Sequence, residues 1–212
     1  MSLHRWFLKT VLKAGSPRAR AARMATFAQL MRLRPHQRVL DLGGTTKLWR
    51  LIDVPLDITV LNLDGQAIDE HRYGVHHFTI VRGDATDVTG YGDNSFDLVF
   101  SNSCIEHVGP PEKQADFARE VRRLAPAYYV QTPAVGFPVE AHTGLPFWWA
   151  YPKSVRDALI RRWERTRPAY AEFINGTRVL SRRDLRRFFP DGNITPEKFM
   201  GLTKSHTVWR RV

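Results

Sequence analysis

Two glutamate–histidine pairs are the residues of this sequence best suited to acid–base chemistry. Glu106 and His107 are adjacent, and one residue separates Glu140 from His142. An imidazole titrates near neutral pH, and a carboxylate beside it can orient the ring or assist it. His107 and His142 are therefore candidate general bases, with Glu106 and Glu140 as their assisting residues.

The same four residues also offer ligands for a metal ion. Carboxylate and imidazole groups both coordinate divalent cations. A divalent metal such as Mg²⁺ is a secondary interpretation of Glu106, His107, Glu140 and His142. Each histidine is also consistent with a purely structural, hydrogen-bonding role.

The apolar run at residues 39–42 contains Asp41 and leads into Gly43 and Gly44. Glycine permits positive φ and lets the main chain approach a bound molecule closely. In an α/β sheet the ligand lies beyond the carboxyl ends of the strands, where such a turn is found. The pattern therefore indicates a buried strand that delivers a ligand-binding turn.

Three further apolar runs end in polar residues in the same way. The run at residues 58–63 is followed by Asp64. The run at 78–81 leads to Asp84 and Ala85, and the run at 96–100 leads to Ser101 and Asn102. Runs of this kind, separated by crossovers, predict parallel strands with a shared ligand edge. An acidic residue about 20 positions beyond a glycine turn is placed to bind both hydroxyls of a ribose, and here that residue is Asp64.

The segments VLDLGGT, LNLD, RGDA and FDLVFSNSCIEHV, taken in order, resemble class I S-adenosylmethionine-dependent methyltransferases. Within that class they are most similar to small enzymes with an S-N-x-x-x-E-H segment after the fourth strand. The resemblance covers residues 38–132 motif by motif. It implies S-adenosylmethionine as cofactor. It implies that Asp41, Gly43 and Gly44 contact the methionine part of the cofactor and that Asp64 binds the ribose. It also implies that Asp84 and Ala85 border the adenine and that Asn102 lies near the sulfonium.

The resemblance also implies an α/β fold with a Rossmann-like, seven-stranded sheet, mostly parallel with an antiparallel last strand and flanked by helices. We expect one domain over residues 1–212. Its parts are a helical extension (1–37), a cofactor-binding core (38–132), an acceptor-covering loop with helices (133–190) and a terminal hairpin (191–212). Thr45 and Lys47 stand where such families usually carry further glycines, which indicates a variant of the first loop.

Local patterns predict the helices. Pro17 opens a helix with Met24, Phe27, Ala28 and Met31 on its inner face, and Pro110-Pro111 opens another with Phe117, Val121 and Leu124 inside. Helices are also expected over residues 152–165 and 181–189, the latter with Ser181 as N-cap and Asp184 at its third position. Residues 194–200 and 203–208 predict a hairpin.

Residues 132–152 predict an irregular loop, because four prolines exclude a continuous helix or central strand. The loop is rich in aromatic residues and contains Glu140 and His142. Aromatic surfaces with indole donors suit an amphipathic acceptor such as a saccharide or polyketide. The alternative is an aromatic cluster that fills the gap between the sheet and the C-terminal helices.

The net charge of +11 is unevenly distributed. Residues 1–38 carry nine basic and no acidic side chains, residues 39–150 are net acidic, and residues 151–212 are again basic. Basic flanks attract phosphate, anionic lipid or nucleic acid, although a solvated arginine-rich surface also explains them. Residues 3–14 predict an amphipathic helix that packs as a lid or homodimer element, or alternatively contacts a membrane surface.

The function expected from these features is O-methylation of a hydroxyl on a saccharide, glycan or similar small molecule. A lipid or natural-product methyltransferase at a membrane surface, and a cofactor-binding protein without catalysis, are alternatives. A nucleic-acid methyltransferase is a further alternative that the basic flanks favour, although Ser101-Asn102-Ser103-Cys104 cannot form the N/D/S-P-P-aromatic segment of base N-methyltransferases, which weakens it. One cysteine and no apolar run of membrane-spanning length predict a cytoplasmic protein.

Overall fold

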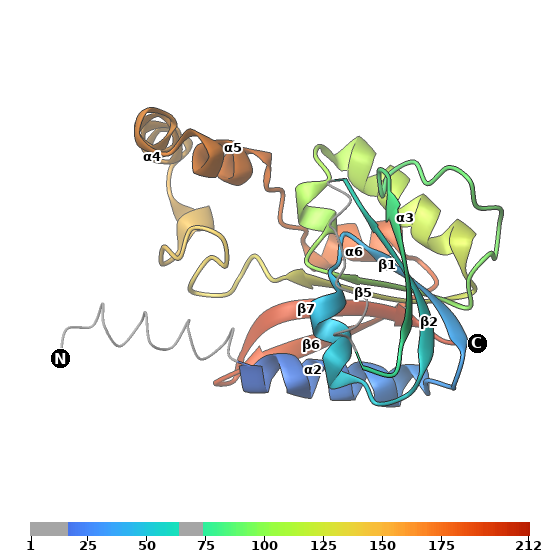
Figure 1. The fold of residues 1–212 in the computed structure, drawn as a ribbon. Helices are drawn as coiled ribbons and strands as arrows, with labels where there is room; N and C mark the ends of the chain where they lie inside the picture. The colour runs from blue at the N-terminus through green and yellow to red at the C-terminus, as the bar shows by residue number, and fades with distance from the viewer. Residues whose placement is uncertain (1–16, 64–73) are drawn as a thin grey trace.

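A seven-stranded mixed sheet organises the residues that the computed structural model describes, 17–63 and 74–212 (Figure 1). The strands are β1 (Gln37–Leu42), β2 (Leu56–Asn62), β3 (His77–Arg82), β4 (Leu98–Asn102), β5 (Ala127–Pro133), β6 (Asn193–Phe199) and β7 (Leu202–Arg210). Their order is β3-β2-β1-β4-β5-β7-β6, in which β7 runs antiparallel to both β5 and β6. This arrangement confirms the fold class expected from the sequence.

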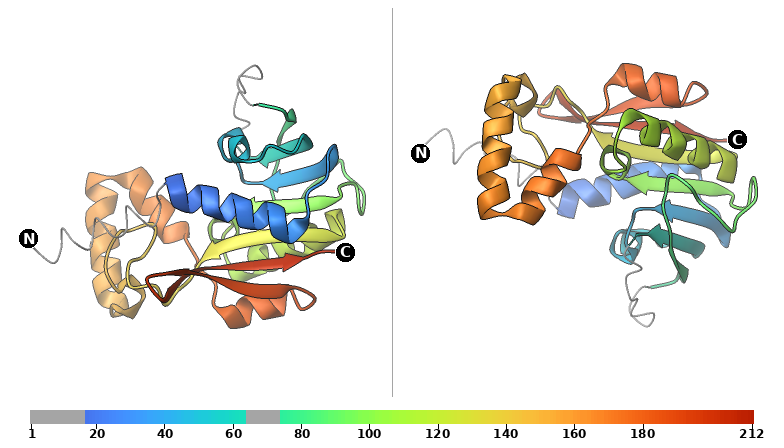
Figure 2. Two further views of the ribbon diagram at one scale, coloured as in Figure 1. Left: turned by 90° about the horizontal axis from the view of Figure 1, so that it is seen from below. Right: turned by 90° about the horizontal axis from the view of Figure 1, so that it is seen from above.

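The central position of β1 sets the ligand edge. Asp41 pairs in register with Val60 of β2 and with Phe100 of β4, so the turn after β1 lies between the ends of its two parallel neighbours. Strand β4 ends at Asn102 rather than at residue 100, so Ser101 and Asn102 belong to the strand itself. The carboxyl ends of the parallel strands face the α4–α5 pair in Figure 2.

Helices cover both faces of the sheet. They are α2 (Pro17–Met31), α3 (Pro111–Leu124), α4 (Lys153–Thr166), α5 (Pro168–Gly176) and α6 (Arg182–Phe188), with short 3₁₀ turns η1 (Thr46–Leu51), η3 (Ile105–His107) and η4 (Trp148–Ala150). Helix α2 and η1 bury Met24, Phe27 and Trp49 against one face. Helices α3 and α6 bury Phe117 and Leu185 against the other. Burial of apolar side chains on both faces is what stabilises a mostly parallel sheet of this kind.

Several predicted helix features are confirmed. Helix α3 begins at Pro111 and buries the predicted Phe117, Val121 and Leu124. The capping box of α6 forms as expected, because Ser181 Oγ accepts the Asp184 N–H at 3.2 Å and the Asp184 carboxylate accepts the Ser181 N–H at 3.0 Å.

Helix α5 was not predicted. Its boundaries do carry a sequence signal, since Pro168 occupies the first turn and Gly176 ends the helix. The segment is short and apolar on average, so hydrophobic periodicity alone does not distinguish it from a loop.

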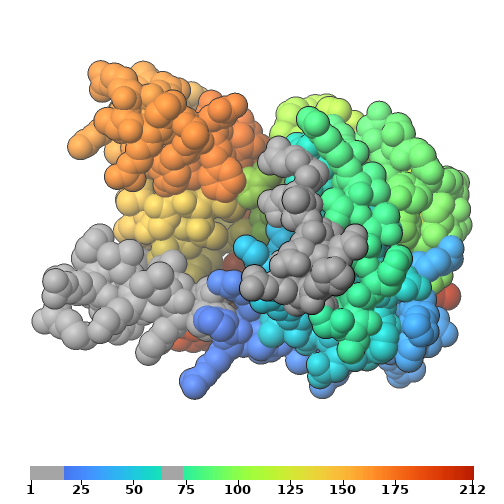
Figure 3. Space-filling model, in the orientation of Figure 1, coloured from blue at the N-terminus to red at the C-terminus, as the bar shows by residue number. Residues whose placement is uncertain are grey.

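Helices α4 and α5 stand apart from the two core layers. No residue of α4 is buried, and the pair contacts the loop before it through Trp163, which stacks on Trp148 at a centroid distance of 5.7 Å. Figure 3 shows this pair as a projecting surface above the 132–152 loop. The arrangement leaves room for a cavity between the loop and the sheet.

Residues 132–152 are largely irregular, as expected. Strand β5 extends to Pro133, and Val139 and Pro146 form an isolated bridge. The predicted helix at residues 3–14, and with it the lid, dimer and membrane interpretations, lies outside the described residues. No helix of the described chain is long and apolar enough to cross a bilayer.

Candidate functional site

The turn after β1 requires glycine at two successive positions. Gly43 has a φ of +73°, and a Cβ there would lie 2.3 Å from Cys104 Sγ. A Cβ on Gly44 would lie 2.0 Å from Asp41 Oδ2. The main chain therefore passes directly over the Asp41 carboxylate, which explains the predicted importance of both glycines.

Asp41 is completely buried beneath this turn. Its Oδ2 accepts a hydrogen bond from the Trp49 indole at 2.8 Å, and its Oδ1 is a buried oxygen without a partner. Burial raises the pKa of Asp41 to about 7, and the hydrogen bond from Trp49 opposes that rise. The 3₁₀ turn η1 brings Trp49 beneath the glycine turn. The loop that contains Thr45 and Lys47 in place of the usual glycines is therefore held by this 3₁₀ turn.

The raised pKa of Asp41 has a testable consequence for stability. A carboxyl with a folded pKa near 7 and an ordinary value of 3.8 binds more protons in the native state between these pH values. Stability from this group is therefore present below about pH 4 and lost as the pH rises toward 7. Asp41→Asn should remove that decline, worth a few kcal/mol at ~1.4 kcal/mol per pKa unit.

Urea unfolding of wild type and Asp41→Asn at pH 4 and pH 7.5 measures the difference. Glu106 also has a raised pKa and contributes to the wild-type slope, so only the difference between the two proteins reports on Asp41. Equal pH dependence in both proteins would contradict the assignment.

A first cavity of about 270 Å³ lies at the ends of β1 to β4, and we call it the strand-end cavity. Its lining brings together the predicted residues Gly43, Asp84 and Ala85 with His107. Asp84 is itself oriented, because its Oδ1 accepts bonds from the N–H and the hydroxyl of Thr86, both at 2.8 Å. The predicted ribose residue Asp64 lies outside the described residues, two positions after the last residue of β2.

Two further residues of the strand-end cavity, Asn62 and Cys104, were not predicted as site residues. The Asn62 amide donates to the Gly44 carbonyl at 3.2 Å and so fixes the glycine turn. Burial, reinforced by the nearby carboxylate of Glu106, raises the pKa of Cys104 to about 12. The thiol therefore stays protonated and is unsuited to act as a nucleophile.

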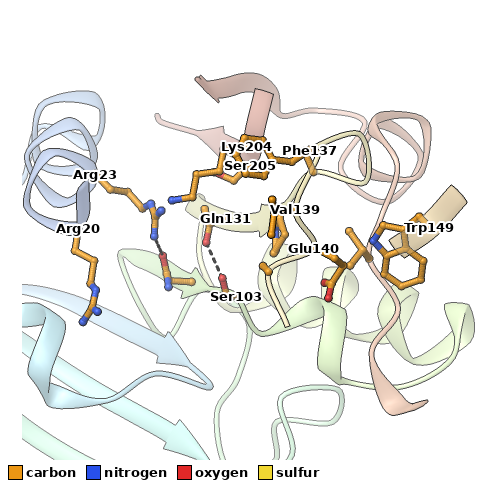
Figure 4. Close-up of a pocket in the computed structure, with 15 residues that line it drawn as sticks. Arg20, Arg23, Ser103, Gln131, Phe137, Val139, Glu140, Trp149, Lys204 and Ser205 are labelled. Atoms are coloured by element: carbon orange, nitrogen blue, oxygen red, sulfur yellow. Dashed lines mark hydrogen bonds between the residues drawn. The ribbon is translucent and has the colours of Figure 1, made fainter. Parts of the chain in front are cut away.

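A second cavity of about 300 Å³ lies between the 132–152 loop, α2 and β7, and we call it the loop cavity (Figure 4). Residues along its wall include Arg20, Arg23, Asn102, Ser103, Gln131, Phe137, Val139, Glu140, Trp149 and Lys204. Asn102, expected near a sulfonium, lines this cavity, and its Oδ1 accepts a hydrogen bond from Arg23 at 3.0 Å. The loop cavity thus joins the end of β4 to the aromatic loop.

Ser103 lines both cavities. It has a φ of +55°, and its hydroxyl donates to the Gln131 side-chain oxygen at 3.0 Å while its N–H donates to the Gln131 carbonyl at 2.9 Å. These two bonds hold the chain where it leaves β4. Ser103 is therefore the point at which the two cavities meet, a role that no local sequence pattern indicates.

Glu140 and His142 form a close pair, as predicted. His142 Nδ1 lies 2.6 Å from Glu140 Oε1, and Glu140 Oε2 accepts the N–H groups of His142 and Thr143 at 3.0 and 2.6 Å. Burial acts to raise the pKa of Glu140, but these hydrogen bonds and the nearby His142 together hold it below its ordinary value. An ionised Glu140 accepts the Nδ1 proton and leaves His142 Nε2 as the basic nitrogen.

The Glu106–His107 pair lies beside the Glu140–His142 pair in the structure. His142 Nε2 lies 4.0 Å from Glu106 Oε1, and the rings of His107 and His142 meet edge to face at 4.8 Å. Glu106 is fully buried, accepts a bond from Thr132 at 2.9 Å through Oε2, and leaves Oε1 without a partner. Burial raises the pKa of Glu106 to about 7.

His107 is held in one orientation by α5. The Thr177 hydroxyl donates to the Phe173 carbonyl at 2.8 Å, so its oxygen accepts from His107 Nδ1 at 3.3 Å. The Phe173 ring stacks on the imidazole at 4.7 Å. Burial, with a smaller effect from His142, lowers the pKa of His107 to about 4, which keeps its imidazole neutral at neutral pH.

Three of the four predicted metal candidates lie together. Donor atoms of Glu106, His107 and His142 are all within 4.8 Å of one another. Glu140 instead supports His142 from behind through Nδ1, as carboxylates commonly support a histidine ligand. Two imidazoles and one carboxylate suit a transition metal better than Mg²⁺, which prefers oxygen ligands.

Some aromatic residues of the 132–152 loop line a cavity, as expected for an acceptor surface, and others pack against the C-terminal helices. Phe137 and Trp149 line the loop cavity, and the Arg156 guanidinium lies over the Trp149 ring at 5.8 Å. Trp148 is buried and packs on Trp163, so it supports the loop rather than facing the cavity. Phe147 is exposed.

The sequence was compared with protein families and with curated proteins. The profile of a family described as Methyltransferase domain matches residues 40–126. A search of curated sequences returned no match.

Solved structures share the fold at low identity. Magnesium protoporphyrin IX methyltransferase from Synechocystis PCC 6803, with bound SAH, is 12% identical and aligns over 99% of this chain and 87% of its own, with a TM-score of 0.55. A SAM-dependent methyltransferase from Aquifex aeolicus is 12% identical over 95% of this chain and 96% of its own, with a TM-score of 0.54. Phosphoethanolamine N-methyltransferase 2 from Haemonchus contortus, in complex with S-adenosyl-L-methionine, is 16% identical over 82% of this chain and 37% of its own, with a TM-score of 0.53.

At these identities the structural likeness shows the fold, and the domain match covers the β1 turn, the strand-end residues and the Glu106-His107 pair. Residues 40–126 therefore match a methyltransferase domain, and the chain has the fold of the class I S-adenosylmethionine-dependent methyltransferases, of which solved examples hold SAH or S-adenosylmethionine.

Proposed function

We propose that this enzyme O-methylates a hydroxyl group of a saccharide or similar small molecule, with His142 as the general base and Glu140 as its partner. The observation that carries the proposal is the Glu140–His142 pair, which connects the two cavities. Glu140 lines the loop cavity, and the His142 ring contacts His107, which lines the strand-end cavity. The loop cavity would hold the acceptor.

The strand-end cavity fits the cofactor. Gly43, Asp84 and Ala85 line it at the carboxyl ends of the strands, and the glycine at position 43 lets the main chain border the cavity without a side chain. We assign Asp41, Gly43 and Gly44 to the methionine part, Asp64 to the ribose, and Asp84 with Ala85 to the adenine. S-adenosylmethionine supplies an activated methyl group from its sulfonium.

The protein's contribution is to align the acceptor and remove its proton. Holding two reactants in line supplies much of the rate of a displacement reaction, and Ser103 at the junction of the cavities suits that role. An alcohol must also lose a proton. His142 Nε2 would take it, since Glu140 holds the Nδ1 proton and both Glu140 and Glu106 stabilise the resulting imidazolium.

The character of the loop cavity supports a saccharide-like acceptor. Phe137, Val139 and Trp149 offer apolar and aromatic surface, and Gln131 with Ser103 offers polar groups close to the junction. Such a mixture suits a ligand with one apolar face and several hydroxyl groups.

An acceptor panel tests the reaction class. Cofactor turnover should appear with hydroxylated saccharides and phenols, and product NMR should place the new methyl group on oxygen. Turnover with amines but not with alcohols would contradict the proposal. The same assays with a chelator, and with added Zn²⁺, Mn²⁺ or Mg²⁺, report whether Glu106, His107 and His142 need a metal.

The cofactor assignment predicts a measurable role for Asp64. Asp64→Ala should weaken binding of S-adenosylmethionine by at least about 1 kcal/mol, because hydrogen bonds to a charged group contribute at least that much. Calorimetric titration of wild type and variant measures the change. A smaller loss would remove Asp64 from the ribose site, and Asp57→Ala, near the start of β2, is a suitable control.

A further inference from the structure

Glu106, His107 and His142 form a cluster of metal-binding side chains where the segment after β4 meets the 132–152 loop. One potential ligand atom from each residue lies within 4.8 Å of the other two. Imidazole nitrogens favour transition-metal ions such as Zn²⁺ and Co²⁺, whereas Mg²⁺ prefers oxygen ligands. The composition of the cluster therefore indicates a transition metal.

The Glu106 carboxylate has one oxygen that no protein group satisfies. Its side chain is fully buried, and Oε2 accepts a hydrogen bond from Thr132 at 2.9 Å, but Oε1 has no hydrogen-bond partner in the described structure. His142 Nε2 lies 4.0 Å from that oxygen, which is beyond hydrogen-bonding distance. A buried polar atom without a partner is costly. A cation between Oε1 and Nε2 would satisfy both atoms.

Each imidazole is held through Nδ1, which leaves Nε2 as its ligand atom. His142 Nδ1 lies 2.6 Å from Glu140 Oε1, which accepts its proton in a hydrogen bond. His107 Nδ1 lies 3.3 Å from the Thr177 hydroxyl, which donates to the Phe173 carbonyl and so accepts from the ring. Metal-binding histidines usually have an oxygen partner of this kind, because it fixes the tautomer and the orientation of the ring.

The spacing of the cluster needs only a small adjustment to hold an ion. Zinc forms bonds of about 2.1 Å to nitrogen and oxygen, so two ligand atoms of a tetrahedral site lie about 3.4 Å apart. The 4.0 Å between His142 Nε2 and Glu106 Oε1 exceeds that separation by about 0.6 Å, a gap that side-chain rotation can close. His107 lines the strand-end cavity, which gives an ion a path to the cluster.

We propose that Glu106, His107 and His142 bind a transition-metal ion such as Zn²⁺, and that this ion inhibits methyl transfer. The inhibition rests on the proposed function, because His142 Nε2 is the atom assigned to take the acceptor proton. One lone pair binds either a proton or a metal ion, so a filled site leaves no free base at this position. Glu140 supports His142 in both states, since it contacts only Nδ1.

Titration of metal-free protein with Co²⁺ and Zn²⁺ tests the site itself. Wild type should bind one Co²⁺ ion, seen by its visible absorption, and Zn²⁺ should displace it. Glu140→Gln should weaken binding by about 10–100-fold, as expected for the outer partner of a ligand. Glu106→Gln and His107→Phe keep the shape of their side chains but remove a ligand, so each should weaken binding by more than Glu140→Gln does.

Two further measurements make the binding test specific. His77→Ala removes a histidine from the exposed edge strand β3 and should bind Co²⁺ as wild type does. Zn²⁺ should also raise the unfolding temperature of wild type, because an ion that binds only the native state stabilises it. This second measurement needs no variant and is independent of any folding defect in Glu106→Gln or His107→Phe.

Turnover of a hydroxylated acceptor tests the inhibition. One equivalent of Zn²⁺ should lower the rate of metal-free wild type at least about tenfold, because a general base typically contributes ~10²–10⁴-fold. Excess chelator should restore the rate. His107→Phe, measured against its own metal-free rate, should be insensitive to the same Zn²⁺ concentration.

Absence of Co²⁺ binding to wild type would overturn the metal site. Equal binding by wild type, Glu106→Gln and His107→Phe would do so too, because the ion would then lie elsewhere. A rate that rises with Zn²⁺ or does not respond to it would overturn the inhibition. Failure of the proposed O-methylation has a different signature, since a protein without turnover on alcohols would still bind Co²⁺ at the cluster.

Discussion

His142→Ala should lower kcat by at least ~10²-fold, within the ~10²–10⁴-fold range that a general base typically contributes. Cofactor affinity should stay within about threefold of wild type, because Gly43, Asp84 and Ala85, which we assign to the cofactor, line the strand-end cavity and His142 does not. The physical reason is the loss of the imidazole that we assign as the base, whose Nδ1 lies 2.6 Å from the Glu140 carboxylate. Single-turnover kinetics and calorimetry measure the two quantities separately.

Comparison of three variants makes the test specific. Glu140→Gln should also lower kcat, and by less, since an amide can still orient His142 but cannot stabilise its charged form. His77→Ala, on the exposed edge strand β3, should leave turnover unchanged. His107→Ala should weaken turnover mainly through loss of packing against His142 and Phe173.

The opposite ranking would reassign the base. If His142→Ala keeps near-normal turnover and His107→Ala abolishes it, the base belongs to the segment after β4. The 132–152 loop would then form only a wall of the acceptor cavity.

The sheet could be predicted because its signals are local. Each parallel strand is an apolar run that ends in polar residues, and a β-strand of this kind needs no distant information to be recognised. The same holds for α6, whose Ser181–Asp184 capping box is complete within four residues.

The site could be predicted only in its parts. Both Glu–His pairs are visible in the sequence, but the 4.0 Å approach of His142 to Glu106 depends on the path of a proline-rich loop over the end of β4. The ion pair between Arg23, on the wall of the loop cavity, and Glu197 has no local signal at all. Arg23 and Glu197 are 174 residues apart, and single basic residues carry little information in a chain with 32 of them.

The loop after the glycine turn contains a contact that the sequence did not predict. Thr45 and Lys47 depart from the usual glycines, and the chain from Thr46 to Leu51 folds as η1. The Trp49–Asp41 hydrogen bond requires η1 to fold against the buried end of β1. A tryptophan within a short apolar segment gives no hint of that partner.

Gly44→Ala should strongly destabilise the fold, because the added methyl group would clash with a buried carboxylate. The new Cβ would lie 2.0–2.2 Å from the three atoms of the Asp41 carboxylate, which is completely buried and cannot move without displacing its neighbours. Overpacking of a core costs about 1–3 kcal/mol. A broken hydrogen bond from Trp49 to a buried carboxylate adds about 1–3 kcal/mol.

We therefore expect Gly44→Ala to lose about 2–6 kcal/mol of unfolding free energy and to bind S-adenosylmethionine at least tenfold more weakly. Urea unfolding and calorimetry measure the two losses. Gly92→Ala is the matched control, because a Cβ there meets only Ser95 Oγ, at 3.9 Å. The double variant Asp41→Ala with Gly44→Ala separates the causes. Removal of the carboxylate should restore much of the stability but not the cofactor affinity. Recovery of both would mean that Asp41 has no part in holding the cofactor.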